Sequence, residues 1–251
     1  MTISACIWDA APKNFSLSSN DIHIWCAVLD LPNLRVEQLA GILSPDEVMR
    51  ANRFHFDEHR KRFIVRRGIL RIILGYYLGI EPNQLQFDYN SRGKPALKKS
   101  GGGDQLRFNL SDSHGMALYA VTRDRDLGVD IEHIRPMTDA EQLVKRFFSD
   151  REYAAFSQLD RTQQEVAFFT CWTRKEAYIK AIGEGLSLPL DRFDVSISPK
   201  EPAKLLSIKG DSQLAESWLL QDLNPAFGYA AALAVEGFDF NLSCWKWVDD
   251  G

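Results

Sequence analysis

The sequence predicts an α+β fold with two lobes. Three observations favour it: each half of the chain has a helical block followed by β structure, a polar turn at Arg123–Asp126 separates the halves, and 251 residues suffice for one large domain or two small ones. We therefore expect an N-terminal lobe over residues 1–124 and a C-terminal lobe over residues 125–251. The two halves do not align by eye as a sequence repeat.

In the first half, residues 21–31 (DIHIWCAVLDL) begin with alternating apolar and polar residues, which predicts a strand. Residues 44–54 open with Ser, Pro, Asp and Glu, the pattern of a helix N-terminus. Apolar residues recur at helical spacing from 61 to 78, and the opposite face of this helix is rich in arginine. Residues 90–97 (NSRGKPAL) predict a turn that leads into an extended segment.

In the second half, residues 116–122 and 127–134 predict two strands that pair around the polar turn. Helical patterns follow at 139–148, at 151–159 and from about 164 to 182. The remaining apolar segments predict strands at the end of 185–197 and at 217–223, 229–235 and 242–248.

Composition excludes several classes of protein. A net charge of −4 and a pI near 5.8 argue against a general nucleic-acid binder. The four cysteines (Cys6, Cys26, Cys171 and Cys244) form no CxxC pair, so we expect neither a zinc site nor a disulfide framework, and we expect a reduced, cytoplasmic setting. We expect no signal peptide, and no apolar segment approaches the roughly 20 residues that span a bilayer.

The charge is nevertheless uneven along the chain. Eight Lys or Arg residues lie between Arg50 and Arg71, against only Asp57 and Glu58. This segment, together with the RGKP motif, favours a local anionic ligand such as a phosphate, although a solvated helix face explains the same residues equally well. The sequence has no GxxxxGK[ST] loop, no GxGxxG after a strand, no GxSxG and no HExxH. A P-loop NTPase, a Rossmann site, an α/β-hydrolase and a zincin are therefore not supported.

Two further motifs carry groups that could do chemistry. On a strand, Asp130 and Glu132 of GVDIEHI project from one face, where a divalent cation such as Mg²⁺ would relieve their repulsion. On a helix, WTRKEAYIK (172–180) aligns Trp172, Glu176 and Lys180 on one face. Taken alone, each motif is better explained by ordinary structure, as a solvated strand face and as a surface Glu–Lys pair.

The order of the motifs is more specific than any one of them. RGKP, FNLSDS, GVDIE, KRFFSDREY and WTRKEAYIKAIGEGLSLPLDRFDV follow one another between about Ser44 and Val195. This series resembles the Sfp-type 4′-phosphopantetheinyl transferases, whose hallmark is GxDxE followed some forty residues later by WxxKE(A/S)xxK. The amino-acid sequence of the basic helix is most similar to that of bacterial members, cyanobacterial ones among them.

The resemblance implies an enzyme of the holo-[acyl-carrier-protein] synthase type. Such enzymes transfer the phosphopantetheine arm of coenzyme A to a serine of an apo acyl or peptidyl carrier protein and release 3′,5′-ADP. It implies two similar α+β lobes related by a pseudo-twofold axis, with coenzyme A between them. The implied partners are coenzyme A and acidic, helical carrier proteins of fatty-acid, polyketide or nonribosomal-peptide synthesis. We expect no nucleic acid and no membrane as partner, and a protein that acts as a monomer.

The resemblance also assigns roles to residues. Asp130, Glu132 and Glu176 would hold Mg²⁺ (or Mn²⁺), with Asp130, Glu176 and Lys180 as the catalytic residues. Glu176 would accept the serine proton, and Lys180 would hold the pyrophosphate and stabilise the leaving phosphate. Coenzyme A would be bound by the residues that match the family's GKP and basic-helix positions and by neighbours chosen for their charge: Lys94, Pro95 and Arg50, with Arg53, Arg60 and Arg62.

The stretch NLSDSHG (109–115) departs from the family pattern N-(I/L/V)-S-H-S. Ser111 and Ser113 are expected at the coenzyme A site, but Asp112 stands where the family has a phosphate-contacting histidine. A carboxylate beside a phosphate is repulsive unless a metal or an arginine intervenes. We therefore expect His114, which would share a strand face with residue 112, or a neighbouring arginine to make the phosphate contact.

Three questions stay open at this level. The departure at Asp112 admits a coenzyme A-binding paralogue with little transferase activity, and the carboxylates admit an unrelated Mg²⁺-dependent pyrophosphate hydrolase. Phe147 and Phe148 could belong to the surface that receives the carrier, although core packing explains them better.

Overall fold

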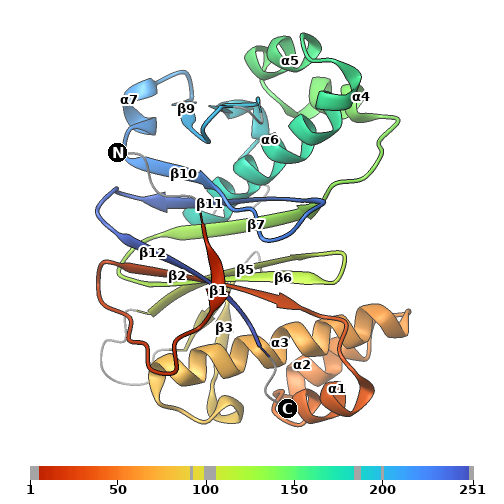
Figure 1. Cartoon of the computed structure of the whole chain (residues 1–251), viewed down its shortest axis with the longest axis vertical. Helices are drawn as coiled ribbons and strands as arrows, with labels where there is room; N and C mark the ends of the chain where they lie inside the picture. The colour runs from red at the N-terminus through yellow and green to blue at the C-terminus, as the bar shows by residue number, and fades with distance from the viewer. Residues whose placement is uncertain (1–5, 91–92, 99–105, 184–187, 199–200, 249–251) are drawn as a thin grey trace.

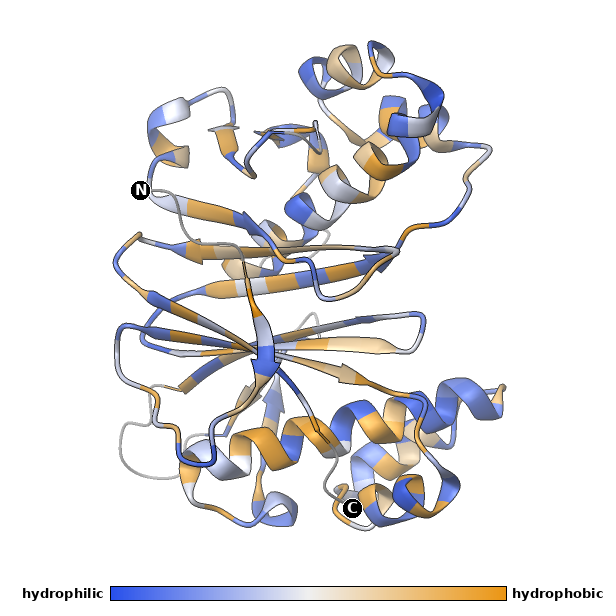
Figure 2. Ribbon diagram, in the orientation of Figure 1, coloured by the Kyte–Doolittle hydropathy of each residue, from blue (hydrophilic) through white to orange (hydrophobic). Residues whose placement is uncertain are grey.

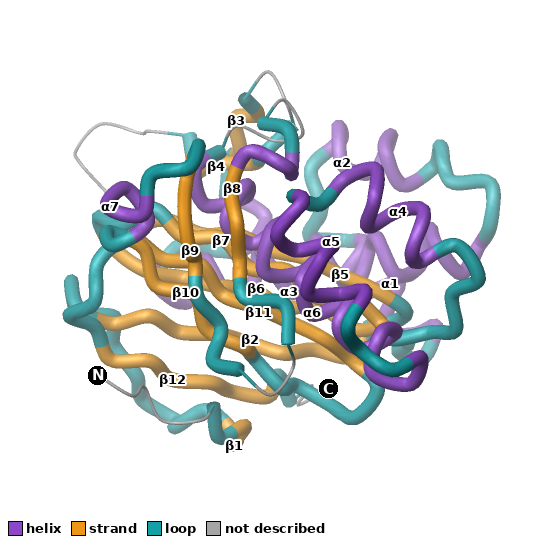
Figure 3. Tube along the Cα trace, turned by 90° about the horizontal axis from the view of Figure 1, so that it is seen from above, coloured by secondary structure: helices purple, strands orange, loops and turns teal. Residues whose placement is uncertain are grey.

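The computed structural model describes residues 6–90, 93–98, 106–183, 188–198 and 201–248, which form four stacked layers. A helical layer covers one face of a five-stranded sheet, a three-stranded sheet packs on its other face, and a second helical layer covers that sheet (Figure 1). In the view from above, the strands of the two sheets overlap (Figure 3). The predicted α+β class is confirmed.

The elements of the first half are β1 (Trp8–Ala10), β2 (Asp21–Val28), α1 (Asn33–Ala40), α2 (Pro45–Ala51), α3 (Asp57–Leu78), η1 (Pro82–Gln84), β3 (Phe87–Tyr89), β4 (Pro95–Leu97), β5 (Leu106–Ser113) and β6 (Met116–Arg123). The helices and strands predicted in the first half are present, although the long basic helix α3 begins at Asp57, earlier than expected, and β1, α1, η1 and β3 were not predicted.

The second half contains a helix, α6, whose 22 residues equal those of α3. Its elements are β7 (Leu127–His133), α4 (Ala140–Phe147), α5 (Asp150–Ser157), α6 (Arg161–Ile182), η3 (Leu190–Arg192), β8 (Phe193–Val195), β9 (Leu205–Ile208), α7 (Ser212–Ala215), β10 (Trp218–Asp222), β11 (Tyr229–Glu236) and β12 (Asn241–Lys246).

The sheet order corrects two expectations. The strands run β1-β12-β2-β6-β5 in one sheet and β10-β11-β7 in the other. The predicted pairing of β6 with β7 is therefore wrong, because both sides of β6 are taken by β2 and β5. The sequence also placed β12 in the C-terminal lobe, whereas β12 pairs in parallel with β1 and β2 of the first half.

Apolar residues fill the space between every pair of layers (Figure 2). Residues of α3, such as Leu70 and Leu74, pack on the five-stranded sheet. Alternate residues of β7, such as Val129 and Ile131, pack between the sheets, and α6 covers the three-stranded sheet. Because side chains alternate along a strand, Asp130 and Glu132 then face α6.

The two sheets meet along one edge, where β5 and β7 run side by side without backbone pairing. Side chains of β5 take the place of a backbone ladder. Val129 N donates to Asn109 Oδ1 over 2.9 Å, and His133 N donates to Ser113 Oγ over 3.1 Å. These bonds satisfy amides on the edge strand β7 that would otherwise lack a partner.

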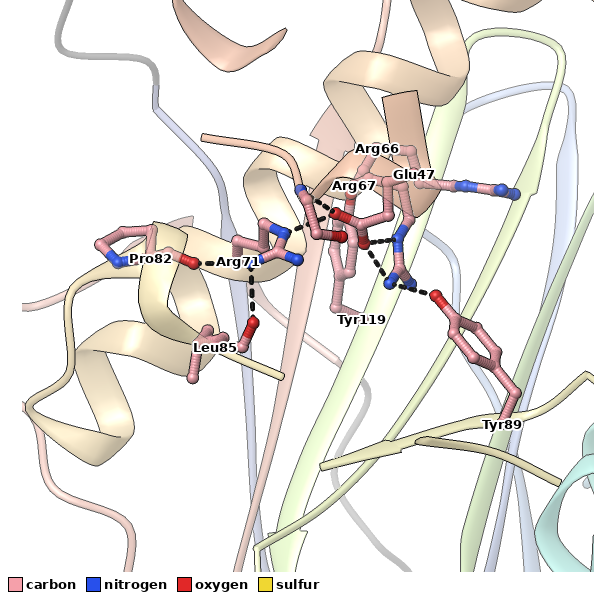
Figure 4. Close-up of polar contacts among 9 residues, drawn as sticks. Glu47, Arg66, Arg67, Arg71, Pro82, Leu85, Tyr89 and Tyr119 are labelled. Atoms are coloured by element: carbon pink, nitrogen blue, oxygen red, sulfur yellow. Dashed lines mark hydrogen bonds and ion pairs between the residues drawn. The ribbon is translucent and has the colours of Figure 1, made fainter. Parts of the chain in front are cut away.

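A buried charge cluster anchors each long helix. In the first half, Glu47 closes the capping box of α2 with Ser44 and accepts hydrogen bonds from Arg67 and Arg71 of α3 (Figure 4). In the second half, Glu152 closes the capping box of α5 with Ser149 and pairs with Lys175 of α6 at 2.8 Å. The two halves therefore share an arrangement that their sequences do not reveal.

Cys6 and Cys244 are joined in a disulfide, contrary to the expectation that no disulfide would form. The parallel pairing of β1 with β12 brings together cysteines that lie 238 residues apart in the sequence. Of the helices that the structure describes, none combines the length and apolar character that a membrane span needs.

We predict an acid-sensitive fold from His23, a buried residue of β2 whose Nδ1 lies 2.8 Å from Tyr77 Oη. Burial lowers the pKa of His23 from 6.5 to about 4, with Asp21 opposing the shift. Because the unfolded chain takes up this proton first, His23 costs stability as the pH falls from about 6.5 toward 4. The loss is at most about 1.4 kcal/mol per pH unit.

The measurement is the free energy of unfolding at pH 7.5, 6, 5 and 4.5 for the wild type and for His23→Gln. We expect a flatter pH dependence in His23→Gln, whereas His55→Gln, which changes an exposed histidine, keeps the wild-type dependence. Equal slopes in all three proteins would contradict the assignment.

Candidate functional site

The candidate site lies where the β5–β7 edge meets α6. It brings together Asp130 and Glu132 from β7 with Glu176 and Lys180 from α6, and it adds Ser111 and Ser113 from β5. Gly128 allows this approach, because a Cβ at that position would lie 2.1 Å from the carbonyl oxygen of Ala177 in α6. The GVDIE and WTRKEAYIK motifs thus meet as the sequence led us to expect.

Hydrogen bonds fix the buried part of the cluster. Lys180 Nζ lies 2.6 Å from Asp130 Oδ1 and 2.8 Å from Ser111 Oγ, and the Ser111 hydroxyl donates to the same carboxylate oxygen over 2.8 Å. Ser113 Oγ donates to Glu132 Oε2 over 2.9 Å. Each serine of FNLSDS therefore orients one carboxylate of GVDIE.

The cluster carries an excess of negative charge. Burial raises the pKa of Glu176, and Asp130 raises it further against the opposing effect of Lys180. Burial also raises the pKa of Glu132, where the Ser113 hydrogen bond opposes the shift and Asp130 adds to it. Three carboxylates thus share one ammonium group, a donor set that favours a second cation.

The donor set fits a hard divalent cation, although the side chains do not converge on one point. Within the described ranges, no three Asp, Glu, His or Cys side chains come close enough together to hold a metal ion. Lys180 occupies Oδ1 of Asp130, while the buried Oδ2 has no hydrogen-bond partner among the residues described. That free carboxylate oxygen, beside Glu132 and Glu176, is the oxygen chemistry that Mg²⁺ prefers.

The β3–β4 hairpin reaches the end of α6. Lys94 Nζ donates to the carbonyl oxygen of Lys180 over 2.5 Å, and burial lowers the pKa of Lys94. Lys94 and Pro95 line a cavity of about 760 Å³ together with Ala181 and Gly183. Lys94 therefore binds the last turn of the helix that carries Lys180. Arg92 of the RGKP motif lies outside the described residues.

The expected arginines separate into two groups. Arg50 and Arg53 are exposed and line a cavity of about 380 Å³ with Tyr89 and Gly93, next to the hairpin. Arg62 instead pairs with Asp30 at 2.7 Å and with Glu58 at 2.6 Å, and Arg60 pairs with Asp57. The structure thus brings Arg50 and Arg53 to a cavity and engages the other two in surface ion pairs.

His114 does not share a strand face with Asp112, contrary to expectation. β5 ends at Ser113, and His114 with Gly115 forms a two-residue hairpin turn in which φ is 45° and 82°. The His114 ring stacks on His133 at 4.7 Å between centroids, and its backbone carbonyl accepts a hydrogen bond from Tyr229 Oη. Burial, His133 and nearby arginines lower the pKa of His114.

The partner of Asp112 is Arg66, which forms an ion pair with it from α3. Arg66 belongs to the basic segment but is not among the arginines expected at the site. The available signal was the acidic residue at position 112, because a carboxylate in an anion site requires a nearby cation.

Two other features of the motifs are structural. Lys175 of WTRKEAYIK is fully buried and donates to the carbonyl oxygens of Leu190 and Phe193. Phe148 is buried, and Phe147 packs on Trp172 with ring centroids 6.3 Å apart. The core interpretation of the two phenylalanines is therefore the better one.

Comparison with known proteins assigns both halves of the chain. Residues 126–234 match the family model described as the 4′-phosphopantetheinyl transferase superfamily, and residues 33–123 match that of the 4′-phosphopantetheinyl transferase N-terminal domain. The 4′-phosphopantetheinyl transferase HetI of Nostoc sp. is 46% identical over 96% of this chain and 98% of its own length.

More distant relatives are also named as 4′-phosphopantetheinyl transferases. The 4′-phosphopantetheinyl transferase psf-1 of Bacillus pumilus is 33% identical over 70% of this chain and 74% of its own length. The 4′-phosphopantetheinyl transferase Sfp of Bacillus subtilis is 29% identical over 64% of this chain and 69% of its own length. A solved structure of holo-[acyl-carrier-protein] synthase from Thermotoga maritima covers 45% of this chain and 62% of its own at 19% identity and a TM-score of 0.35, too remote to bear on the assignment. The chain belongs to the 4′-phosphopantetheinyl transferase superfamily.

Proposed function

We propose that this protein transfers the 4′-phosphopantetheine arm of coenzyme A to a serine of an apo acyl or peptidyl carrier protein and releases 3′,5′-ADP. The observation that carries the proposal is the cluster of Asp130, Glu132, Glu176 and Lys180, formed from the two most specific motifs of the sequence. The relatives, all named as transferases of this group, support the same reaction.

Glu176 and Lys180 take complementary parts in the reaction. The serine oxygen attacks the phosphorus that bears the pantetheine arm, and the bond from this phosphorus to the oxygen of the leaving 3′,5′-ADP breaks. Glu176 accepts the serine proton, a role that suits a carboxylate whose raised pKa makes it a stronger base. Lys180 lies one helical turn away and stabilises the negative charge on the leaving phosphate.

Asp130, Glu132 and Glu176 would hold Mg²⁺ or Mn²⁺, and this cation would neutralise the charge of the pyrophosphate. The buried Oδ2 of Asp130, which has no hydrogen-bond partner among the described residues, supports the part of Asp130 in this set. Ser111 and Ser113 position the two strand carboxylates. Lys94, Pro95, Arg50 and Arg53 surround the nucleotide end of coenzyme A.

The protein acts on its carriers as a monomer, since its two halves together supply the groups of one site. The alternative function, a coenzyme A-binding paralogue with little transferase activity, was suggested only by Asp112. It is not favoured, because Arg66 pairs with the Asp112 carboxylate. A panel of apo carrier proteins would identify the carriers that the protein modifies.

We predict phosphopantetheine transfer in a mixture of the protein, coenzyme A, Mg²⁺ and a panel of apo carrier proteins, detected as an added mass on the carrier. Glu176→Gln removes the proton acceptor and should slow transfer about 100-fold or more, as should Asp130→Ala. Asp139→Asn, which changes an exposed acidic residue, is the control. Absence of the adduct on every carrier, or full activity in the double variant Asp130→Ala, Glu176→Ala, would refute the function.

We predict that Mg²⁺ stabilises the free protein. At a concentration 100 times its Kd, a bound ion adds about 2.7 kcal/mol to the free energy of unfolding. The increase in Tm on adding Mg²⁺ should disappear in the double variant Glu132→Gln, Glu176→Gln. It should persist in the control variant Glu141→Gln, which changes an exposed residue of α4. An equal shift in both variants would place the ion elsewhere.

We predict that Lys94 stabilises the end of α6. Lys94→Met removes the donor to the Lys180 carbonyl and should lower the free energy of unfolding by about 1 kcal/mol. Because the carbonyl belongs to Lys180 itself, loss of this bond should also disturb the position of the Lys180 side chain and lower the transfer rate. Lys98→Met changes an exposed lysine just after the same hairpin and should affect neither quantity. Identical behaviour of the two variants would contradict this role.

A further inference from the structure

Lys180 balances the charge of the candidate site. Its Nζ forms an ion pair with Asp130 Oδ1 at 2.6 Å. Glu132 and Glu176 lie close enough to this pair for the charges of both partners to act on them. Among the residues that the structure describes, no other lysine or arginine forms an ion pair with these three carboxylates. The cluster therefore relies on one ammonium group for compensation of its charge.

The two partners of this ion pair differ in their freedom to move. The side chain of Asp130 is 6% exposed, whereas that of Lys180 is 28% exposed. A lysine side chain has a flexible stem of four carbons. Lys94 holds the carbonyl oxygen of Lys180, so the backbone stays in place when the ammonium moves. The buried carboxylate is thus the fixed partner, and the ammonium is the one that can leave.

Ser111 offers the ammonium of Lys180 a second partner. The Oγ of Ser111 lies 2.8 Å from Lys180 Nζ and 2.8 Å from Asp130 Oδ1. A hydroxyl can accept a hydrogen bond from an ammonium as well as donate one to a carboxylate. An ammonium that leaves Asp130 therefore keeps an acceptor at the edge of the cluster.

A second cation on Asp130 conflicts with Lys180 in its present position. Asp130 is buried, and two cations at one buried carboxylate repel each other strongly because little water screens them. With Lys180 in this place, the part of the chain that the structure describes brings no three acidic, histidine or cysteine side chains close enough to share an ion. Movement of the ammonium removes the repulsion and frees Asp130 Oδ1 as a further ligand atom.

We propose that Lys180 is the resident cation of Asp130 in the metal-free protein, and that it gives up this position to a divalent cation and is released toward the phosphate of the substrate. This inference rests on the divalent cation of the proposed function. The buried carboxylate stays compensated before and after the exchange, as a buried charge requires. Lys180 becomes available to a phosphate only once the ion is bound.

The exchange makes the divalent cation and Lys180 compete for one carboxylate. Coupling between two such events is reciprocal, so each weakens the hold of the other on Asp130 by the same factor. Removal of the ammonium should therefore tighten the binding of the ion. In turn, a saturating ion should cancel the contribution of Lys180 to the stability of the fold.

The first experiment is calorimetric titration of Mg²⁺ into the full-length protein without coenzyme A or carrier. Lys180→Met should bind Mg²⁺ about 10-fold more tightly than the wild type. Lys180→Arg keeps a cation beside Asp130 and should bind Mg²⁺ nearly as the wild type does. Lys145→Met removes the same charge from an exposed position on α4 and is the control, with the affinity of the wild type.

The Tm of the same variants tests the reverse effect. Without Mg²⁺, Lys180→Met should have a lower Tm than the wild type, because Asp130 loses its partner. At saturating Mg²⁺ this difference should become small, whereas Lys145→Met should match the wild type in both conditions.

A third measurement follows Lys180 in the wild type. An amine-specific acetylating reagent, with mass spectrometry of the digested protein, reports how accessible each lysine is. Mg²⁺ should increase the acetylation rate of Lys180 several-fold, because the ammonium leaves its buried partner, and should not change that of Lys145.

The outcomes separate this inference from the proposed function. Equal Mg²⁺ affinity in the wild type and Lys180→Met, or an acetylation rate of Lys180 that Mg²⁺ leaves unchanged, would overturn the exchange while the transferase function stands. If the wild type bound no Mg²⁺, the exchange and the proposed metal site would both fall, while transfer to a carrier would still be judged by the mass of the carrier. Should Lys180→Met fail to fold, the acetylation of the wild type decides alone.

Discussion

The site depends on the side-chain hydrogen bonds that join two sheet edges. Asn109, Ser111 and Ser113 occupy alternate positions on β5, and each reaches β7 or a carboxylate upon it. If β5 and β7 were paired by backbone hydrogen bonds, they would lie about 4.8 Å apart, and these side chains would project from the faces of the sheet instead of bridging the two strands. The side chains of Ser111 and Asp130 at this edge are contacted by Lys180 of α6. The polar motif of β5 thus both closes the molecule and positions its charges.

The charged residues of the long helices divide into those that stabilise the fold and those that lie at the candidate site. Glu47 and Glu152, each the third residue of a short capped helix, anchor the basic residues of α3 and α6. Removing one partner from such a cluster leaves a buried charge uncompensated, at a cost of about 3–5 kcal/mol. These positions are therefore occupied for stability, whereas Glu176, one position after Lys175, lies among the carboxylates of the candidate site.

Local patterns made most helices predictable, because capping boxes, helical periodicity and strand alternation act over a few residues. The meeting of Asp130, Glu132, Glu176 and Lys180 was predicted only through the resemblance of the ordered motifs to a known family, because each motif alone is better explained by ordinary structure. Long-range partners were not predictable: adjacent strands β6 and β7 enter different sheets, and β12 joins strands more than 200 residues away. The ion-pair partner of a charged residue, such as Arg66 for Asp112, could not be predicted either, because it depends on the three-dimensional arrangement of residues far apart in the sequence.

The position of β12 also constrains how the chain folds during synthesis. β12 lies between β1 and β2, so β2 presents an unpaired edge until residues 241–246 have left the ribosome. That edge carries the largely apolar segment Asp21–Val28, the kind of strand that associates with other chains when it is unpaired. The first half can therefore not complete its five-stranded sheet alone, and the edge of β2 stays open to association with other chains until β12 pairs with it.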